Sequence, residues 1–223
     1  MPSSTAGQRP TATFQTGSEV KPRRKDICDP TRLSVEMTVE MRAKHIFTFA
    51  LSFLTLVSAG AAKEKLIGTV PPDWSVTNWI NSAPLTLKEL RGKVLLVRWW
   101  TAPECPYCRA TAPALNTFNE NYSARGLQVI GFYHHKSEEP LRAEHVSKFA
   151  NEFGFKFPVA TDTDWKTLHR WWLDRGKENW TSVSFLIDRR GVIRHIHPGG
   201  EYVKGDKDYA AMKTKIEQLL AEK

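Results

Sequence analysis

The chain has 223 residues, of which 41% are hydrophobic, 11% aromatic and 25% charged. These ordinary fractions exclude collagen, wholesale disorder and a polytopic membrane protein, and three cysteines are too few for a small disulfide-stapled scaffold. The net charge is +8, but residues 62–223 carry only +5 with the two signs interspersed. The sequence therefore predicts no nucleic-acid partner.

The first 40 residues do not resemble a folded domain. Residues 1–40 are rich in Pro, Ser, Thr and charge and lack a periodic apolar pattern, which predicts a disordered extension. The alternative is that translation starts downstream of Met1, at Met37 or Met41, because a secretory signal acts from the N-terminus. Cys28 lies in this segment, and we expect no chemical role for it.

Residues 41–61 have the anatomy of a secretory signal peptide. A short basic start precedes an uncharged run from Ile46, and Ala59 and Ala61 suit an Ala-x-Ala cleavage site. The 17 residues from Ile46 to Ala62 are also at the lower limit for a membrane-spanning helix, so an N-terminal membrane anchor is the alternative. Either interpretation predicts an extracytoplasmic protein, which is periplasmic, secreted or anchored facing outward.

Residues 62–223 are expected to form one domain in which strands and helices alternate. A lead-in with a short hairpin precedes a strand at 94–100 whose continuous apolar run indicates burial on both faces. Segments with apolar residues at helical spacing then alternate with strand-like apolar runs. The expected elements are a helix ending near 126, a strand at 127–133, a helix at 141–153, a short strand at 157–160, a helix at 165–172, a hairpin at 183–197 and a helix at 209–219. Pro158 restricts the short strand to an edge or a strand start. This order predicts an α/β fold with a mixed, mainly parallel sheet and helices on both faces.

The tetrad Cys105-Pro106-Tyr107-Cys108 lies where the buried strand ends and a helix begins. Unpaired backbone N–H groups and the helix dipole stabilise a thiolate at such a position. We expect Cys105 to be the exposed nucleophile and Cys108, one turn later, to resolve the mixed disulfide. A structural zinc site normally has four ligands, and a second paired motif is absent from the sequence. Two inert core cysteines are the other alternative.

A resemblance to a known family rests on several motifs together: residues 90–97, Trp99-Trp100, the tetrad, Pro113 and residues 185–191. With them, the chain resembles the thioredoxin superfamily and most of all its exported TlpA-like thiol-disulfide oxidoreductases. The helix expected at 138–153 resembles the insertion of that family, and the segment 185–191 resembles its closing β-hairpin, which precedes a C-terminal helix. The resemblance implies that Cys105 and Cys108 exchange a redox-active disulfide with protein thiols, without a further cofactor, and that the partner is a membrane or periplasmic redox protein.

Three positions depart from the family pattern. The place of the usual cis-proline holds Ser182, after Thr181. A cis bond without proline costs about 2.5–4 kcal/mol, so a trans bond and a differently shaped substrate groove are expected. Glu104 replaces the usual Trp before the first cysteine, and its carboxylate opposes thiolate formation. Arg98 stands where thioredoxins keep a buried acid, and an arginine is expected to point to solvent.

The histidines offer a possible metal site. His134 and His135 follow the strand at 127–133, and His197 follows the last strand, so they could approach the two cysteines and form a sulfur–nitrogen site for copper or zinc. The preferred interpretation is that they are exposed loop-end histidines and that no metal is held. His145 is expected in the core. Four tryptophans are expected in the core and the groove wall: Trp165, Trp171, Trp172 and Trp180.

The sequence leaves three functions open. A thiol-disulfide oxidoreductase is favoured by the placement of the tetrad. A thiol peroxidase, in which Cys105 attacks peroxide and Cys108 resolves the sulfenic acid, is suggested by the loss of the proline. A copper or zinc carrier using Cys and His ligands is the third.

Overall fold

The computed structural model describes residues 65–175 and 179–222. The expectations for residues 1–40 and 41–61, namely an extension, a signal peptide or an anchor, lie outside the described residues. Among the helices that are described, none has the length and apolar character needed to cross a membrane.

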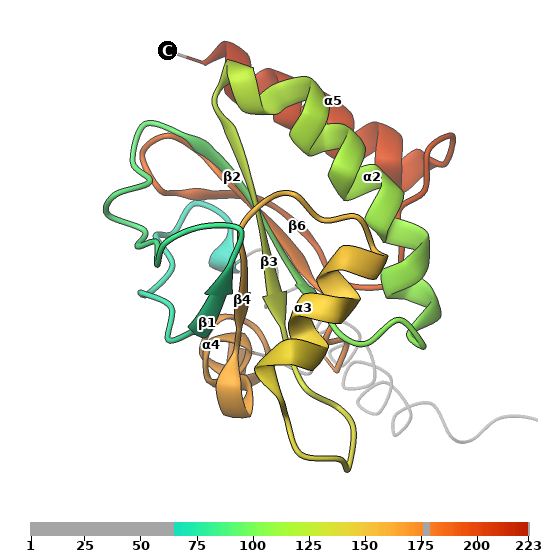
Figure 1. Cartoon of the computed structure of the whole chain (residues 1–223). Helices are drawn as coiled ribbons and strands as arrows, with labels where there is room; N and C mark the ends of the chain where they lie inside the picture. Colours follow the sequence, from blue (N-terminus) through green and yellow to red (C-terminus); the bar gives the residue numbers. More distant parts are fainter. Residues whose placement is uncertain (1–64, 176–178, 223) are drawn as a thin grey trace, which may run out of the picture. The chain divides into compact units, whose positions relative to one another are not determined.

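A six-stranded mixed sheet forms the centre of the described domain (Figure 1). Its strands are β1 (Thr77–Ile80), β2 (Val94–Trp100), β3 (Leu127–Tyr133), β4 (Val159–Thr161), β5 (Ser184–Ile187) and β6 (Ile193–His197), in the spatial order β1-β4-β3-β2-β5-β6. The strands β2, β3 and β4 are parallel, whereas β1, β5 and β6 each pair antiparallel to their neighbours. The expected mixed sheet is confirmed, although its parallel part comprises only three strands.

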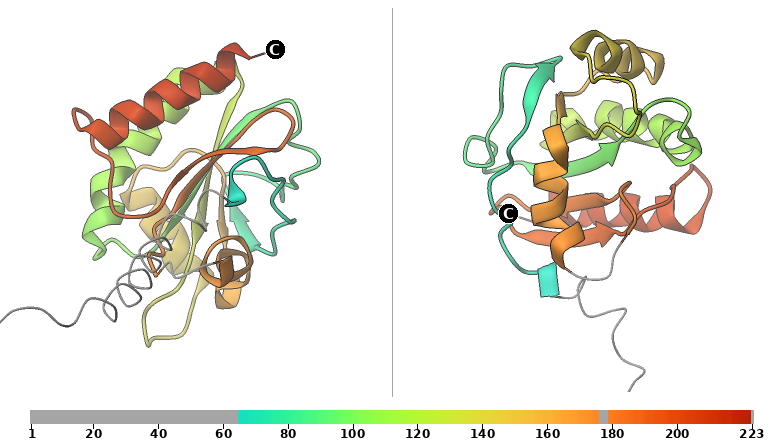
Figure 2. Two further views of the ribbon diagram at one scale, coloured as in Figure 1. Left: turned by 180° about the vertical axis from the view of Figure 1, so that it is seen from behind. Right: turned by 90° about the horizontal axis from the view of Figure 1, so that it is seen from below.

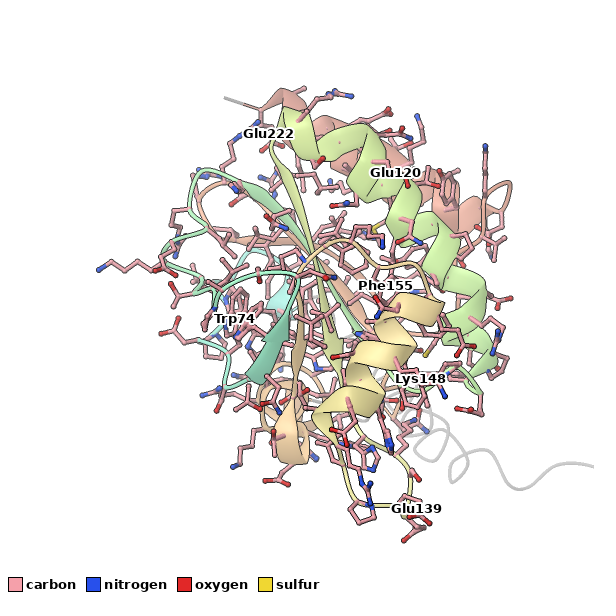
Figure 3. The ribbon with its side chains drawn as sticks, viewed as in Figure 1. Trp74, Glu120, Glu139, Lys148, Phe155 and Glu222 are labelled. Atoms are coloured by element: carbon pink, nitrogen blue, oxygen red, sulfur yellow. The ribbon has the colours of Figure 1, made fainter. Side chains whose placement is uncertain are left out.

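Helices cover both faces of the sheet (Figure 2). The helices are α2 (Pro106–Tyr122), α3 (Ala143–Glu152), α4 (Lys166–Trp171) and α5 (Lys207–Ala221), with the short 3-10 turns η1 (Ser123–Arg125), η2 (Thr163–Trp165) and η3 (Leu173–Arg175). Residues from α2, α3 and α5 share one apolar core, and α4 with the lead-in segment 66–90 forms the other. In Figure 3, Phe155 belongs to the first core and Trp74 packs against the second.

The central strand β2 and the last helix match their sequence patterns closely. All seven residues of β2 are buried, as its continuous apolar run predicted. The apolar stripe of α5 is also the buried one, and its members are Tyr209, Met212, Ile216 and Leu219. Asp206 caps α5 by accepting a hydrogen bond from the backbone N–H of Tyr209 at 2.6 Å. The expected C-terminal helix is therefore confirmed.

The lead-in contains one strand, so the expected hairpin is wrong. Strand β1 pairs antiparallel with β4, and β4 consequently lies inside the sheet and not at its edge. Asn81, at φ 63°, donates hydrogen bonds from its amide to the carbonyls of Phe155 and Phe157 at 3.0 and 3.1 Å. These bonds tie the end of β1 to the β4 side of the sheet. Pro158 precedes the first residue of β4, which confirms its strand-start position.

The α3 helix exposes His145, which contradicts its expected place in the core. The buried residues of α3 are Val146 and Ala150, and Phe153 continues this stripe just beyond the helix. The buried face is therefore rotated by one residue from the pattern that included His145. Gly154, at φ 71°, ends the element as expected.

Candidate active site

The turn after β2 delivers Cys105 to the beginning of α2. Cys105 is the N-cap residue, and its Sγ accepts a hydrogen bond from the backbone N–H of Cys108 at 3.3 Å. Its own backbone N–H donates to the carbonyl of Ala102 at 3.0 Å, which closes the turn. Pro106 occupies the first helical turn, where its missing N–H costs no helical hydrogen bond. The sulfur of Cys105 thus lies among the unpaired N–H groups of a helix start.

The two cysteine side chains differ in exposure and lie in direct contact. Both are free thiols, and the Sγ of Cys108 donates to the Sγ of Cys105 over 2.7 Å. Cys105 is partly exposed, whereas Cys108 is only 3% exposed. A partner can therefore reach Cys105 first, and Cys108 can react only with Cys105.

Cys108 holds its proton strongly. Burial raises the pKa of the Cys108 thiol to about 12, and the hydrogen bond to Cys105 acts in the same direction. A backbone hydrogen bond from Thr101 and the positive charge of Arg98 act in the opposite direction. Cys108 is consequently a neutral thiol in the reduced protein at neutral pH.

Arg98 points into the protein, which contradicts the expectation that it faces solvent. It is 1% exposed, because strand alternation places it with Leu96 and Trp100 on the face of β2 that α2 covers. Its Nη2 donates to the carbonyl of Gly200 at 2.7 Å, and its guanidinium carbon lies 5.3 Å from the centre of the Tyr202 ring. Neutral acceptors and an aromatic face therefore accommodate the buried cation.

The segment before β5 replaces the family's cis-proline as expected. The described residues contain no cis peptide bond, so the bond from Thr181 to Ser182 is trans. Ser182 is buried, and its Oγ accepts a hydrogen bond from the backbone N–H of Gly200 at 3.1 Å. Thr181 is partly exposed beside it. The serine hydroxyl thereby ties this loop to the segment that follows β6.

An exposed aromatic pair lies beside the tetrad. Tyr107 is 40% exposed and meets Trp180, 46% exposed, edge to face with ring centroids 5.6 Å apart. Glu104 and Pro106 are also exposed. Trp180 is the exposed member of the four tryptophans that were expected in the core and the groove wall. The signal available was its position just before Thr181, in the loop expected to form the groove.

The structure buries two of the three histidines, so their expected exposure is wrong for His134 and His197. His134 is 1% exposed and meets Trp165 edge to face at 5.2 Å. Burial lowers the pKa of His134 to about 3, the positive charge of Lys136 adds to this, and the nearby carbonyl of Trp100 opposes it. Neither ring nitrogen of His134 makes a hydrogen bond to the part of the chain that the structure describes. His134 is therefore neutral at physiological pH.

The other two histidines have polar neighbours. His135 is partly exposed, and its ring nitrogens lie 3.0 Å from the Tyr133 hydroxyl and 2.6 Å from the Glu139 carbonyl oxygen. The Nε2 of His197 lies 3.8 Å from a carboxylate oxygen of Asp208. Across residues 65–175 and 179–222, no three His, Cys, Asp or Glu side chains come together in a way that could hold a metal ion. The metal-carrier alternative therefore lacks a ligand set in these ranges.

The chain is similar to proteins of known class. The Redoxin family profile matches residues 71–213. Over 170 residues the chain is 32% identical to the protein DipZ of Mycobacterium bovis. This match covers 75% of this chain and 23% of DipZ. Over 149 residues it is 30% identical to the thiol-disulfide oxidoreductase ResA of Bacillus thuringiensis, covering 66% of this chain and 79% of ResA.

Solved structures show the same architecture. A putative thiol:disulfide interchange protein DsbE from Chlorobium tepidum superposes with a TM-score of 0.57 at 24% identity, covering 70% of this chain and 98% of that one. A putative protein disulfide isomerase from Bacteroides thetaiotaomicron gives a TM-score of 0.56 at 25% identity, covering 70% and 91%.

The fold and the relatives together define an oxidoreductase with the thioredoxin fold. They confirm the resemblance to the thioredoxin superfamily and its TlpA-like members. The chain belongs to the Redoxin family. It spans about a quarter of the length of the DipZ proteins that it matches.

Proposed function

We propose that this protein is an extracytoplasmic thiol-disulfide oxidoreductase that exchanges the dithiol or disulfide of Cys105 and Cys108 with protein thiols. The observation that carries the proposal is the pair itself. Two free sulfurs lie 2.7 Å apart at the beginning of α2, one accessible and one buried. The name of ResA, a thiol-disulfide oxidoreductase, supports the same chemistry.

The proposed reaction proceeds in two exchange steps. The thiolate of Cys105 attacks a partner disulfide, so a mixed disulfide forms and one partner sulfur leaves with the bonding electrons. Cys108 then attacks the Sγ of Cys105, the Cys105–Cys108 bond forms, and the second partner sulfur leaves. The pair loses two electrons, the partner gains them, and the two protons of the dithiol end on the partner's thiols. The reverse sequence oxidises a partner dithiol, and the direction depends on the two reduction potentials.

The aromatic pair and the loop before β5 are proposed as the substrate groove. Tyr107 and Trp180 offer an exposed apolar surface beside Cys105, the partly exposed Thr181 follows Trp180 in the chain, and the buried Ser182 anchors this loop from inside. Apolar contacts there would hold a partner segment while its sulfur reacts. The exposed carboxylate of Glu104 adds a negative charge to the rim.

The extracytoplasmic location rests on the signal-like residues 41–61. We infer that the partner is a membrane or periplasmic redox protein and that the cysteine pair is the only redox group needed. Alkaline phosphatase fused after residue 75 tests the location, because that enzyme is active only outside the cytoplasm. Phosphatase activity that disappears when residues 41–61 are deleted from the fusion supports export. A full-length fusion that is also inactive contradicts it.

The redox proposal is tested by equilibrating the protein with glutathione buffers and trapping its free thiols. The wild type and Cys28→Ser should oxidise reversibly as a two-electron couple and catalyse reduction of a protein disulfide. Cys105→Ser should abolish both properties, and Cys108→Ser should accumulate a mixed disulfide. A wild-type pair that never oxidises reversibly would overturn the proposal.

A further inference from the structure

The buried Arg98 has a positive charge, and no carboxylate in the described part of the chain balances it. Its nitrogens donate to Gly200, Ser184 and Thr111, all of which are neutral acceptors, over 2.7, 3.2 and 3.5 Å. Within residues 65–175 and 179–222, it takes part in no ion pair with an acidic side chain. A buried charge is costly unless it is paired, so the burial of this arginine needs a physical reason.

The titratable groups that face this cation are few. Of the described groups whose pKa is displaced, three feel the charge of Arg98, namely Cys108, His134 and Tyr202. Burial raises the pKa of Tyr202 and lowers that of His134 to about 3, so both are neutral at pH 7. The remaining group, Cys108, becomes an anion whenever it takes part in exchange.

The local geometry connects Arg98 with Cys108. Thr111, which accepts a hydrogen bond from Arg98, lies three residues after Cys108 on the same face of α2. Both Cys108 and Thr111 are buried toward β2, the strand that carries Arg98. The Oγ1 of Thr111 also accepts from the backbone N–H of Tyr202 at 3.4 Å. The guanidinium is thus held from several sides in the core into which the Cys108 sulfur is buried.

We propose that Arg98 is a positioning residue whose buried cation is the counter-charge of the Cys108 thiolate during disulfide exchange. This inference rests on the proposed function. In the resolution step the Cys108 thiol loses its proton and its thiolate attacks the Sγ of Cys105. The Cys105–Cys108 bond forms, the bond from Cys105 to the partner breaks, and the leaving partner thiolate takes up a proton.

In the reverse direction the same thiolate is the leaving group. A partner thiolate attacks Cys105, the Cys105–Cys108 bond breaks, and Cys108 departs with the electron pair. Arg98 therefore assists both directions. It should change the equilibrium potential at pH 7 little, because the disulfide and the protonated Cys108 thiol are both neutral. This combination distinguishes the proposal from a general structural role.

The test uses the full chain carrying Cys28→Ser, reduced and mixed with excess dithiobis-nitrobenzoate. Cys105 should release the first thionitrobenzoate, and attack by Cys108 should release the second. Arg98→Gln keeps hydrogen-bond donors without the charge, and Arg98→Lys keeps the charge. Removing the charge should slow the second release about threefold for each unit by which the pKa of Cys108 rises, because the tenfold loss of thiolate is partly offset by the greater nucleophilicity of a more basic thiolate. The first release should be unchanged, and the lysine variant should recover most of the second rate.

Controls separate the possible failures. Arg109→Gln removes an exposed α2 cation that pairs with Glu152, and it should leave the second release unchanged. Ultraviolet titration of the Cys108 thiolate in Cys105→Ser should shift upward when Arg98→Gln is added. Three outcomes would overturn the Arg98 proposal alone: Arg98→Gln leaves the second release unaffected, it slows the first release equally, or Arg98→Lys fails to recover the second rate.

If Arg98→Gln does not fold, Arg98→Lys decides. Its second release should stay near the wild-type rate and the pKa of its Cys108 should be unshifted, and a large change in either would overturn the proposal. A protein that releases only the first product even with Arg98 present would instead overturn the proposed function.

Discussion

Tyr107 and Trp180 meet edge to face beside the tetrad, with an interplanar angle of 77°. One ring comes from α2 and the other from the loop before β5, so the contact joins two segments that are more than 70 residues apart in the sequence. Edge-to-face pairs are stabilising, yet both rings leave large fractions exposed. Large exposed aromatics of this kind are typical of binding surfaces.

Trp180→Ala should therefore weaken reaction with protein substrates. We expect kcat/KM for a protein disulfide to fall about tenfold or more, because truncating a central aromatic contact costs about 2 kcal/mol. Reaction with a small disulfide should be unchanged, since it needs only Cys105. Ile67→Ala removes an exposed apolar residue of the lead-in and is the control. Equal loss with both kinds of substrate would show that Trp180 acts on the cysteines and not on the partner.

Gly199 lies against the side chain of Trp180 and should not tolerate a side chain of its own. Its φ is 149°, and an added Cβ would lie 2.4 Å from the Cβ of Trp180. Gly199→Ala should lower the free energy of unfolding by about 2–4 kcal/mol, through strain and overpacking together. Gly200→Ala, at φ 80° with open space around it, should show the strain alone. Urea denaturation measures both, and similar losses would contradict the contact with Trp180.

His134 should make stability depend on pH. Its folded pKa of about 3 is below the ordinary 6.5, so the unfolded state binds the proton more strongly. The contribution of His134 to the free energy of unfolding is therefore fully present above pH 6.5. It falls as the pH drops toward 3, by up to about 1.4 kcal/mol per pH unit. His134→Phe should remove this part of the pH dependence, which paired urea titrations of the two proteins measure. If the free energies of unfolding of the wild type and His134→Phe change with pH in the same way from neutral to acidic pH, His134 is not buried.

The sequence predicted the elements whose apolar pattern is local. The continuous run at 94–100 and the stripe at Tyr209, Met212, Ile216 and Leu219 are explicit in the residues themselves. Strand β1 was missed because its partner β4 lies about 80 residues further on. No local pattern reports such a pairing.

The candidate site shows the same division. The position of Cys105 at a helix start follows from the tetrad and the strand before it. The inward orientation of Arg98 does not follow, because it depends on the carbonyl of Gly200, which is 102 residues away. His134 is buried against Trp165, which is 31 residues further along the chain, in the same non-local way, whereas His197 packs against Tyr202 only five residues later. General preferences for exposed Arg and His therefore fail at the positions where tertiary contacts decide the burial of the side chain.

The closing hairpin depends on one buried carboxylate, Asp188. Its side chain accepts hydrogen bonds from the backbone N–H groups of Arg190 and Val192, each at 2.9 Å, and an oxygen lies 3.0 Å from Arg194. Burial acts to raise the pKa of Asp188, but these hydrogen bonds outweigh it and the pKa is lowered. The carboxylate therefore stabilises the fold above its ordinary pKa, and the contribution is lost as the pH falls through the lowered value.

Asp188→Asn should consequently destabilise the protein by about 2–4 kcal/mol at pH 7, because it removes the charge that Arg194 faces in a buried position. The difference from the wild type should shrink in acid, where both proteins lack the negative charge. Asp164→Asn breaks an exposed pair with Lys166 and should cost less than about 0.5 kcal/mol. Chemical denaturation at neutral and acidic pH measures the difference. A loss at Asp188 that persists unchanged in acid would mean that shape, and not charge, is what the hairpin requires at this position.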